Sequence, residues 1–334
     1  MADVRGAILR GTAEASRLHR ALDARARIAA EGGRVDVFGT IVGLGVPLIF
    51  KPLDGLLGAF MPEPAPGVLI TTRRPLSVQR FTGAHELGHC RLGHRPSLDD
   101  ETILRRMPFQ EGADYETHEL EADAFAAEFL TPAWLVAEHF RRQGWSASDM
   151  GDPRAVYQLS LRVGASYQAT CWALDRHKVI GRPMREKLLG AQPKAIKRNV
   201  LQGYEPPDWW GDVWAISERD QGAVIEGSRN DLFRVRLREQ SGAGYLWSFE
   251  ELERSGFVVV RDEREAAGET IGGAVTRCVT ARSENRRSGK LTFHQRRPWL
   301  RRERPLSELT LAYDLYGPEE EGWSQAERRR LEAA

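Results

Sequence analysis

The sequence is poor in cysteine and has no long apolar run. Three cysteines, Cys90, Cys171 and Cys278, occur in 334 residues, and none belongs to a CxxC pair. An odd number of widely separated cysteines argues against a disulfide framework and fits a reducing compartment. No apolar run reaches the length of a membrane span, and the N-terminal stretch is charged, unlike a signal peptide. These absences predict a cytoplasmic protein without a membrane partner.

A charge excess of either sign is lacking as well. The chain carries 48 basic and 47 acidic residues, for a formal net charge of +1. Such a balance lacks the basic excess of a nucleic-acid-binding surface, so we expect no direct contact with nucleic acid. Hydrophobic residues make up 41% and charged residues 28%, which is typical of a globular protein with a buried core. The length of the chain predicts two domains.

The pattern along the chain changes near residue 190. Before that point, apolar residues recur every three or four positions, as in helices, with one short β-rich run, GVLITT. After residue 212, short runs with alternating apolar residues follow one another between turns, which is typical of a β-sandwich. We therefore predict a multidomain α+β fold: a mainly helical domain (1–190), a linker (191–212), an all-β sandwich (213–318) and a helical tail (319–334).

His85, Glu86 and His89 form the motif HELGH on a predicted helix that follows Pro75. Histidines four residues apart lie on one helix face, where two imidazoles suit a tetrahedral Zn²⁺. Glu86 is turned toward the open side, where it can take a proton from an activated water and pass it to a leaving amine. The alternative is that all three are polar residues on an ordinary solvated helix face.

A catalytic zinc needs a third protein ligand. Three and six residues after His89 stand Leu92 and Arg95, which excludes the ligand spacing of the metzincins. His94 is one position off and lies at the end of the same predicted helix. An interaction with the negative end of the helix dipole is the simpler role for it.

A second predicted helix, THELEADAFAAEFL (117–130), offers a better ligand. Glu119 and Asp123 are four residues apart and share one face. The Glu119 carboxylate can complete the metal site, and Asp123 can accept the second ring N–H of a ligating histidine. Glu121 points about 200° away from Glu119 on an ideal helix, so we expect it to lie outside the site. An acidic helix face without a metal is the alternative.

The segments HELGHCRLGH, ELEADAFAAEFLTP and GVLITT make residues 1–185 similar to the ImmA/IrrE family of metallo-endopeptidases. The resemblance implies a helical zinc peptidase of the gluzincin type. It also implies that His85, His89 and Glu119 are the metal ligands and that Glu86 is the general base. Mn²⁺ suits a set of two histidines and one glutamate as well.

The resemblance further implies a substrate and a cellular role. Members of this family cleave, or help to cleave, helix-turn-helix repressors of the XRE type in the control of mobile elements, defence or stress responses. An extended substrate is expected to pair with the strand at 67–72 as an added edge strand. The peptidase pattern starts almost at the first residue, so we expect the repressor to be a separate protein. The alternative is a regulator that binds and sequesters its partner without cutting it.

Three turn segments of the second half occur in the order REQSGAGYLW (238–247), IGGAVTR (271–277) and RRPW (296–299). Over residues 213–317 this order resembles the chagasin-like inhibitors of papain-type cysteine proteases. The resemblance implies an immunoglobulin-like sandwich whose three loops meet at one end. The candidate partner-binding residues are Gly244, Tyr245, Trp247, Gly272, Gly273, Arg297, Pro298 and Trp299.

The first of these loops departs from the family pattern. Where the family has Asn-Pro-Thr-Thr-Gly-Tyr, this chain has residues 240–245, and Ala243 stands at the threonine that enters a target cleft. We therefore favour a recognition or regulatory module that binds a partner or covers the peptidase. Inhibition of a cysteine protease by the sandwich is the alternative. For Trp247, a place in the sandwich core is the competing interpretation.

Overall fold

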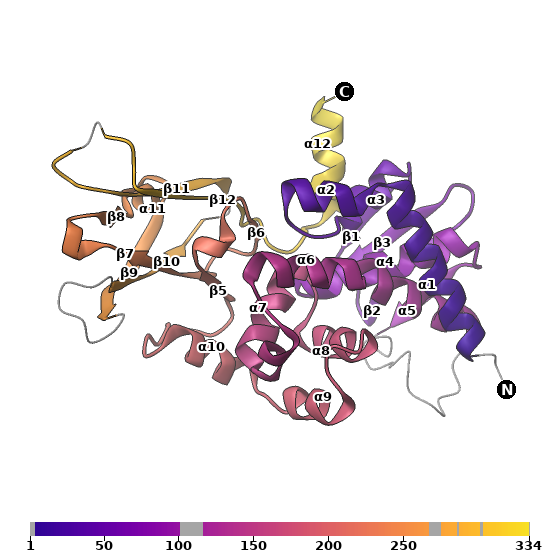
Figure 1. The fold of residues 1–334 in the computed structure, drawn as a ribbon. Coiled ribbons are helices and arrows are strands. Elements are labelled where there is room, and N and C mark those ends of the chain that lie inside the picture. Colours follow the sequence, from indigo (N-terminus) through magenta and orange to yellow (C-terminus); the bar gives the residue numbers. More distant parts are fainter. Residues whose placement is uncertain (1–3, 101–115, 267–274, 286, 301–302, 334) are drawn as a thin grey trace.

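The computed structural model describes residues 4–100, 116–266, 275–285, 287–300 and 303–333. Figure 1 shows a helical domain with a small sheet beside a sandwich of two sheets. This confirms the predicted fold class, a multidomain α+β chain in which a mainly helical domain precedes an all-β sandwich. Within the described ranges, no helix combines the length and apolarity needed to cross a membrane.

Two neighbouring helices of the helical domain, α4 (Leu76–Leu92) and α5 (Thr117–Leu130), carry the predicted site residues. Helix α4 begins after Pro75 and ends at Gly93, which adopts a left-handed φ of 69° that favours glycine. The other elements of this domain are α1 (Val4–Ala21), α2 (Ala24–Glu31), α3 (Val37–Gly43), β1 (Leu48–Lys51), β2 (Leu56–Met61), β3 (Gly67–Thr71), β4 (Ser97–Asp100), α6 (Ala133–Gln143), α7 (Pro153–Val163), α8 (Tyr167–Arg176), α9 (Arg182–Leu189) and α10 (Pro193–Leu201).

Small residues let α1, α4 and α5 approach one another closely. A Cβ added to Gly88 of α4 would lie 3.2 Å from the Cα of Ala122 and from the side chain of Phe125, both on α5. A Cβ on Gly11 of α1 would lie 2.1 Å from the carbonyl oxygen of Glu121. Because these positions hold glycine, α5 packs against both neighbours at short range and its acidic residues reach the histidines of α4.

The sheet of the helical domain has the order β13-β1-β3-β2-β4. Strand β3 is parallel to β1 on one side and antiparallel to β2 on the other. The expectation that residues 67–72 form the edge on which a substrate pairs is therefore wrong, because both edges of β3 are already hydrogen-bonded. The outer strands among the described residues are β4 and β13 (Gly322–Trp323).

The sandwich consists of one four-stranded sheet in the order β5-β7-β10-β9 and a second in the order β6-β12-β11-β8. Burial alternates along β11 and β12, as expected for strands with one face on a core. The core includes Phe233, Phe293 and Leu311. The elements are β5 (Val213–Ile216), β6 (Val224–Glu226), β7 (Leu232–Glu239), β8 (Leu246–Ser248), α11 (Glu250–Arg254), β9 (Phe257–Ala266), β10 (Val275–Ser283), β11 (Ser288–Arg296) and β12 (Ser307–Asp314).

Two stretches differ from the simple division drawn from the sequence. The predicted linker, 191–212, contains helix α10, whose Ile196 and Leu201 are buried with Val213 and Leu232 of the sandwich. The predicted tail, 319–334, contains strand β13 and helix α12 (Gln325–Ala333). Strand β13 pairs with β1, so the end of the chain returns from the sandwich to the sheet of the helical domain.

The two domains meet through buried polar contacts from helix α7. The Gln158 side chain donates to the Val213 carbonyl at 2.7 Å and accepts from the Ala215 N–H at 2.9 Å, so it pairs with the edge of β5. Arg162, on the next turn, forms an ion pair with the buried Asp220 at 2.8 Å. The two Gln158 contacts satisfy backbone groups at the start of the sandwich, and the Arg162 ion pair adds a buried charge pair beside them.

Candidate metal centre

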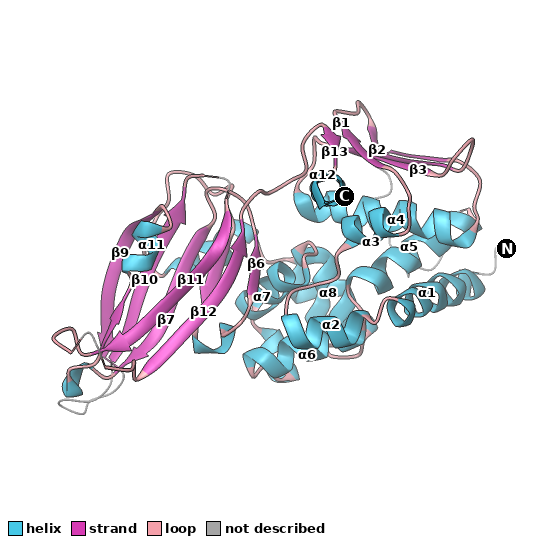
Figure 2. Cartoon of the chain, turned by 90° about the horizontal axis from the view of Figure 1, so that it is seen from above, coloured by secondary structure: helices cyan, strands magenta, loops and turns pink. Residues whose placement is uncertain are grey.

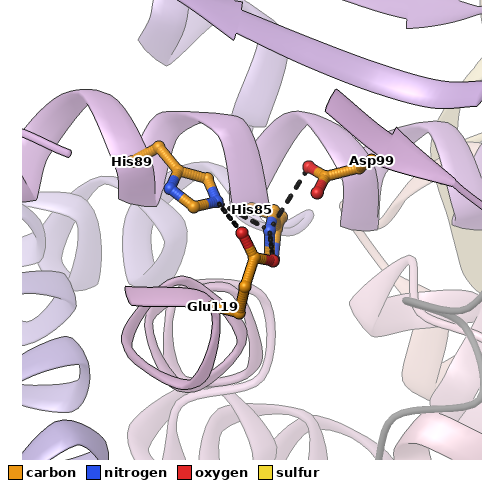
Figure 3. Close-up of side chains that lie close together, drawn as sticks. All are labelled: His85, His89, Asp99 and Glu119. Atoms are coloured by element: carbon orange, nitrogen blue, oxygen red, sulfur yellow. Dashed lines mark hydrogen bonds and ion pairs between the residues drawn. The ribbon is translucent and has the colours of Figure 1, made fainter. Parts of the chain in front are cut away.

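The rings of His85 and His89 converge on one point. Both side chains are fully buried, and their Nε2 atoms lie 2.9 Å apart, as the spacing of one helical turn predicts. Glu119 faces them from α5, with Oε2 3.4 Å from His85 Nε2 and Oε1 3.7 Å from His89 Nε2 (Figure 3). The structure thus brings together the three residues that the sequence proposes as ligands.

Asp123 lies one turn beyond Glu119, on the outer side of the His85 ring. Its Oδ1 is 2.9 Å from His85 Nδ1, and the carboxylate is buried. An acceptor at Nδ1 keeps the proton on that nitrogen and leaves the lone pair of Nε2 directed at the site. This is the placement expected for a residue that orients a ligating histidine.

The His89 ring is held in a comparable way by residues that sequence reasoning put elsewhere. His94 Nδ1 lies 2.9 Å from His89 Nδ1, and His94 Nε2 lies 2.9 Å from Glu121 Oε2. Arg10 of α1 donates to Glu121 Oε1 at 2.7 Å. Glu121 lies outside the group of possible ligands, as expected, yet it is linked to His89 through His94. The simple helix-dipole role does not describe His94, because both of its ring nitrogens have side-chain neighbours.

Asp99 is the site residue that sequence reasoning missed. Its Oδ2 lies 3.4 Å from His85 Nε2, and one ligand atom each from His85, His89, Asp99 and Glu119 lies within 4.8 Å of the others. The residue belongs to β4, in a stretch that its charge predicts to be a loop. The two adjacent aspartates, Asp99 and Asp100, could have indicated a metal ligand. The sequence does not show, however, that β4 pairs with β2 and so lies beside α4.

Glu86 is buried between α4 and the sheet. A Cβ added to Gly58 of β2 would lie 2.6 Å from Glu86 Oε1, so this glycine makes room for the carboxylate. Burial, together with the neighbouring Asp99, raises the pKa of Glu86 well above its usual value. A buried carboxyl group with a raised pKa beside two histidines has the properties of a general base and acid.

The imidazoles differ in protonation. Burial disfavours a charged His85, but the carboxylates of Asp123 and Glu119 outweigh it and raise the pKa of His85 well above its usual value. Burial and the nearby His85 lower the pKa of His89 to about 2, so its ring is neutral. Carboxylates that favour a positive charge at His85 also favour a metal cation beside it.

The donor set fits a divalent metal ion. Imidazole nitrogen and carboxylate oxygen are the ligands that zinc takes in proteins, and here they are buried and converge. The outer ring nitrogens of both histidines are engaged by Asp123 and His94, as is usual for ligating histidines.

Arg91, Tyr115 and His118 stand near the two motifs in sequence and are candidates for stabilising the oxyanion of peptide cleavage. Arg91 binds Glu14 at 2.7 Å and is thereby turned toward α1. His118 lies 3.2 Å from Glu119 Oε1 and is partly exposed, so a substrate bound at the site can reach it. Tyr115 lies outside the described residues. Burial raises the pKa of Cys90, which disfavours a thiolate role.

Two of the three sandwich loops meet at the end that faces away from the helical domain (Figure 2). The guanidinium of Arg297 lies over the Tyr245 ring at 4.6 Å, and Trp299, with 68% of its surface exposed, lies against Gly244. Pro298 lies between Arg297 and Trp299 in sequence. Gly272 and Gly273 lie outside the described residues. These loops do not cover the metal centre.

Trp247 behaves differently from its neighbours in the first loop. It is 5% exposed and belongs to the sandwich core, and its indole N–H donates to the Arg238 carbonyl at 2.9 Å. Its ring is therefore not available to a partner, which corrects its place among the binding candidates.

Two known protein families match separate parts of the chain. Residues 43–175 match the model of the IrrE N-terminal-like domain, and residues 227–313 match that of the chagasin family peptidase inhibitor I42. The chain thus contains a region similar to the IrrE N-terminal-like domain and a second region similar to the chagasin family, which confirms both resemblances drawn from the sequence.

One curated protein is similar to part of the chain. The radiation response metalloprotease IrrE of Deinococcus radiodurans is 32% identical over 180 residues, which is 49% of this chain and 50% of that protein. The chain therefore spans about half the length of this curated relative.

Among solved structures, the cysteine protease inhibitor EhICP2 of Entamoeba histolytica is 22% identical, with a TM-score of 0.30, and the match covers 32% of this chain and 99% of that one. A transcriptional regulator of Mycobacterium tuberculosis is 12% identical, with a TM-score of 0.33, over 84% of this chain and 79% of that one.

Proposed function

We propose that this protein is a zinc-dependent endopeptidase of the gluzincin type that acts on a protein substrate. The observation that carries the proposal is the convergence of His85 Nε2 and His89 Nε2, 2.9 Å apart, with the Glu119 carboxylate facing both. The IrrE N-terminal-like domain supports it. A zinc ion held there, for which Mn²⁺ is the alternative, would supply the Lewis acidity that peptide hydrolysis needs.

The chain's own residues then have distinct tasks. His85, His89 and Glu119 hold the ion, and Asp123 keeps the proton on His85 Nδ1 so that Nε2 is free to bind it. Glu86 accepts the proton of the attacking water and delivers it to the leaving amine. The buried position of Glu86 beside Gly58 supports this role, because a carboxylate shielded from water is a stronger base than an exposed one.

The substrate that we propose is a helix-turn-helix repressor of the XRE type, cleaved in the cytoplasm during a stress response or in mobile-element or defence regulation. The similarity to a protein described as a radiation response metalloprotease supports the stress-related role. The sandwich is proposed as the recognition module, through Tyr245, Arg297 and Trp299. The exposed indole of Trp299 supports this assignment, because exposed aromatic rings are common anchors in interfaces.

The test is a cleavage assay with the helix-turn-helix repressor encoded nearest to the gene. Zinc-loaded wild type is expected to cut at a defined site, and Glu86→Gln to retain zinc and fold but lose at least about 10²-fold in rate, because it lacks the proton acceptor. Equal cleavage by both proteins contradicts the proposal. Binding without cleavage by either one favours the sequestering regulator. In a third arm, Trp299→Ala in the Glu86→Gln background is expected to weaken repressor binding at unchanged zinc content.

A further inference from the structure

The metal centre contains one carboxylate more than a peptidase needs. Three protein ligands hold a catalytic zinc, and the fourth position stays open for water or substrate. Here His85, His89 and Glu119 supply three donors, and Asp99 brings a fourth donor into the same group, within 4.8 Å of the others. Figure 3 shows that the Asp99 carboxylate approaches His85 from the side opposite Glu119.

The position of Asp99 is fixed by the sheet. Strand β4 pairs antiparallel with β2, and Asp99 is in register with Gly58, the residue that leaves room for Glu86. The Asp99 side chain is 2% exposed and its Oδ2 lies 3.4 Å from His85 Nε2. Its neighbour Asp100 is exposed, because alternate residues of a strand point to opposite faces. Asp99 is thus the residue of β4 that faces the histidines.

We propose that Asp99 is a fourth protein ligand of the metal ion, which competes with water for the open position and so restrains the activity of the peptidase. The inference rests on the proposed function of this centre. With Asp99 bound, the ion would have four protein donors, and a site whose four positions are all filled by protein is closed rather than catalytic. Activity then requires the carboxylate of Asp99 to move away.

The fold makes such a movement possible at small cost. Strand β4 is an outer strand with β2 as its neighbour among the described residues, and its register with β2 shifts between Leu56 and Gly58. Displacing it breaks one short ladder and leaves the order β1-β3-β2 intact. The three other donors lie on α4 and α5, so they hold their places when β4 moves.

The experiment compares wild type with Asp99→Asn and Asp99→Ala in the full chain, with Asp100→Asn as the matched control. Asp100→Asn removes the same charge from the same strand on its exposed face. The metal is first replaced by Co²⁺, whose visible absorption reports the number of ligands, and azide is added as a probe of an open position. Zinc affinity is measured by competition with a chromophoric chelator, and thermal melting of the metal-free proteins shows that all are folded.

We expect the Co²⁺ spectrum of wild type and Asp100→Asn to be insensitive to azide and that of both Asp99 variants to respond to it. Zinc affinity is expected to fall at least about 10-fold in the Asp99 variants, which is the lower end of the range seen when a group around a metal site is removed. Repressor cleavage is expected to increase.

Spectra and affinities like those of Asp100→Asn overturn the proposal. So does a loss of cleavage at unchanged metal affinity, because Asp99 then acts with Glu86 instead. If the spectra and affinities change as expected but no variant cleaves the repressor, Asp99 is a ligand and the proposed peptidase function is what fails.

Discussion

At the residue scale, the proposed centre depends on which nitrogen of each imidazole carries a proton. His85 Nδ1 faces Asp123 at 2.9 Å, and His89 Nδ1 faces His94 at the same distance. If His89 binds a metal through Nε2, its Nδ1–H donates to His94 Nδ1, and the second nitrogen of His94 must then donate to Glu121. The two histidines proposed as ligands are therefore oriented by different means, one by a carboxylate directly and the other through a second imidazole.

Glu121 is expected to control metal affinity although it lies outside the ligand group. In Glu121→Gln the side-chain amide can donate to His94 and reverse its tautomer, which removes the acceptor of the His89 Nδ1–H. We expect zinc affinity to fall about 10- to 100-fold, the range for loss of a partner around a ligating histidine. Competition with a zinc chelator measures it. The control is Glu128→Gln on the same helix, which is paired with Arg176 away from the site and should leave the affinity unchanged. Equal affinities for both variants contradict this role of Glu121.

At the element scale, helix α5 is the part on which the site depends most. It supplies Glu119 and Asp123 to the histidines of α4 and, through Glu121, accepts from Arg10 of α1. Its close contacts with both helices rest on Gly11 and Gly88, where a side chain would meet backbone or core atoms. A change in the packing distance of α5 therefore changes the geometry of the metal centre.

Gly11→Ala tests this dependence. The new Cβ would lie 2.1 Å from the Glu121 carbonyl oxygen and 2.9 Å from the Phe125 nitrogen, so α1 must move away from α5. We expect a loss of about 1–3 kcal/mol in the free energy of unfolding, measured by chemical denaturation, together with weaker zinc binding. Gly43→Ala at the end of α3, with no atom within 4 Å of its added Cβ, should be neutral or stabilising by up to about 1 kcal/mol. A Gly11→Ala protein as stable as Gly43→Ala contradicts the close packing.

At the scale of the whole molecule, the two domains are joined by charged and polar contacts as well as by the chain. Glu226 of the sandwich forms ion pairs with Arg34 and Arg80 of the helical domain. Gln79 of α4 accepts from the Glu319 N–H at 2.8 Å, which ties the returning C-terminal segment to the helix that carries HELGH. These contacts join the two domains, and the sandwich loops lie at the end far from the candidate metal centre (Figures 1 and 2).

The Glu226 contacts predict a dependence of stability on pH. Burial alone would raise the pKa of Glu226, but Arg34 and Arg80 outweigh it and hold the pKa below its usual 4.5. A carboxyl whose pKa is lower in the folded state contributes stability that is present above its unfolded pKa and is lost as the pH falls through the folded one. In Glu226→Gln this contribution is absent, so the decrease in stability below about pH 4.5 should be shallower.

At pH 7, Glu226→Gln is expected to lose about 1–2 kcal/mol, less than a fully buried pair would, because a third of this side chain is exposed. Chemical denaturation at several pH values measures both effects. Glu205→Gln removes an exposed pair with Arg198 and serves as the control, with little change expected. Identical pH profiles for wild type and Glu226→Gln would show that the pair does not contribute.

The sequence by itself determined the parts of this protein that depend on local spacing. Four-residue intervals placed His85 with His89 and Glu119 with Asp123, because residues one helical turn apart share a face whatever surrounds them. Alternating apolar residues predicted the sandwich in the same way, since successive side chains of a strand point to opposite faces. The pairing of the two helices was inferred from complementary chemistry, two imidazoles that lacked a ligand and a carboxylate that offered one.

Only the tertiary structure decided which distant segments became neighbours. It placed β3 inside the sheet and β4 at its edge, and so brought Asp99 to the histidines, because strand order depends on hydrogen bonds between segments far apart in sequence. It linked Glu121 to His89 through His94, a path that no helical wheel shows, since His94 lies beyond the end of α4. It also buried Trp247, which lies in β8 and packs in the sandwich core, and left Trp299 exposed in a turn after β11.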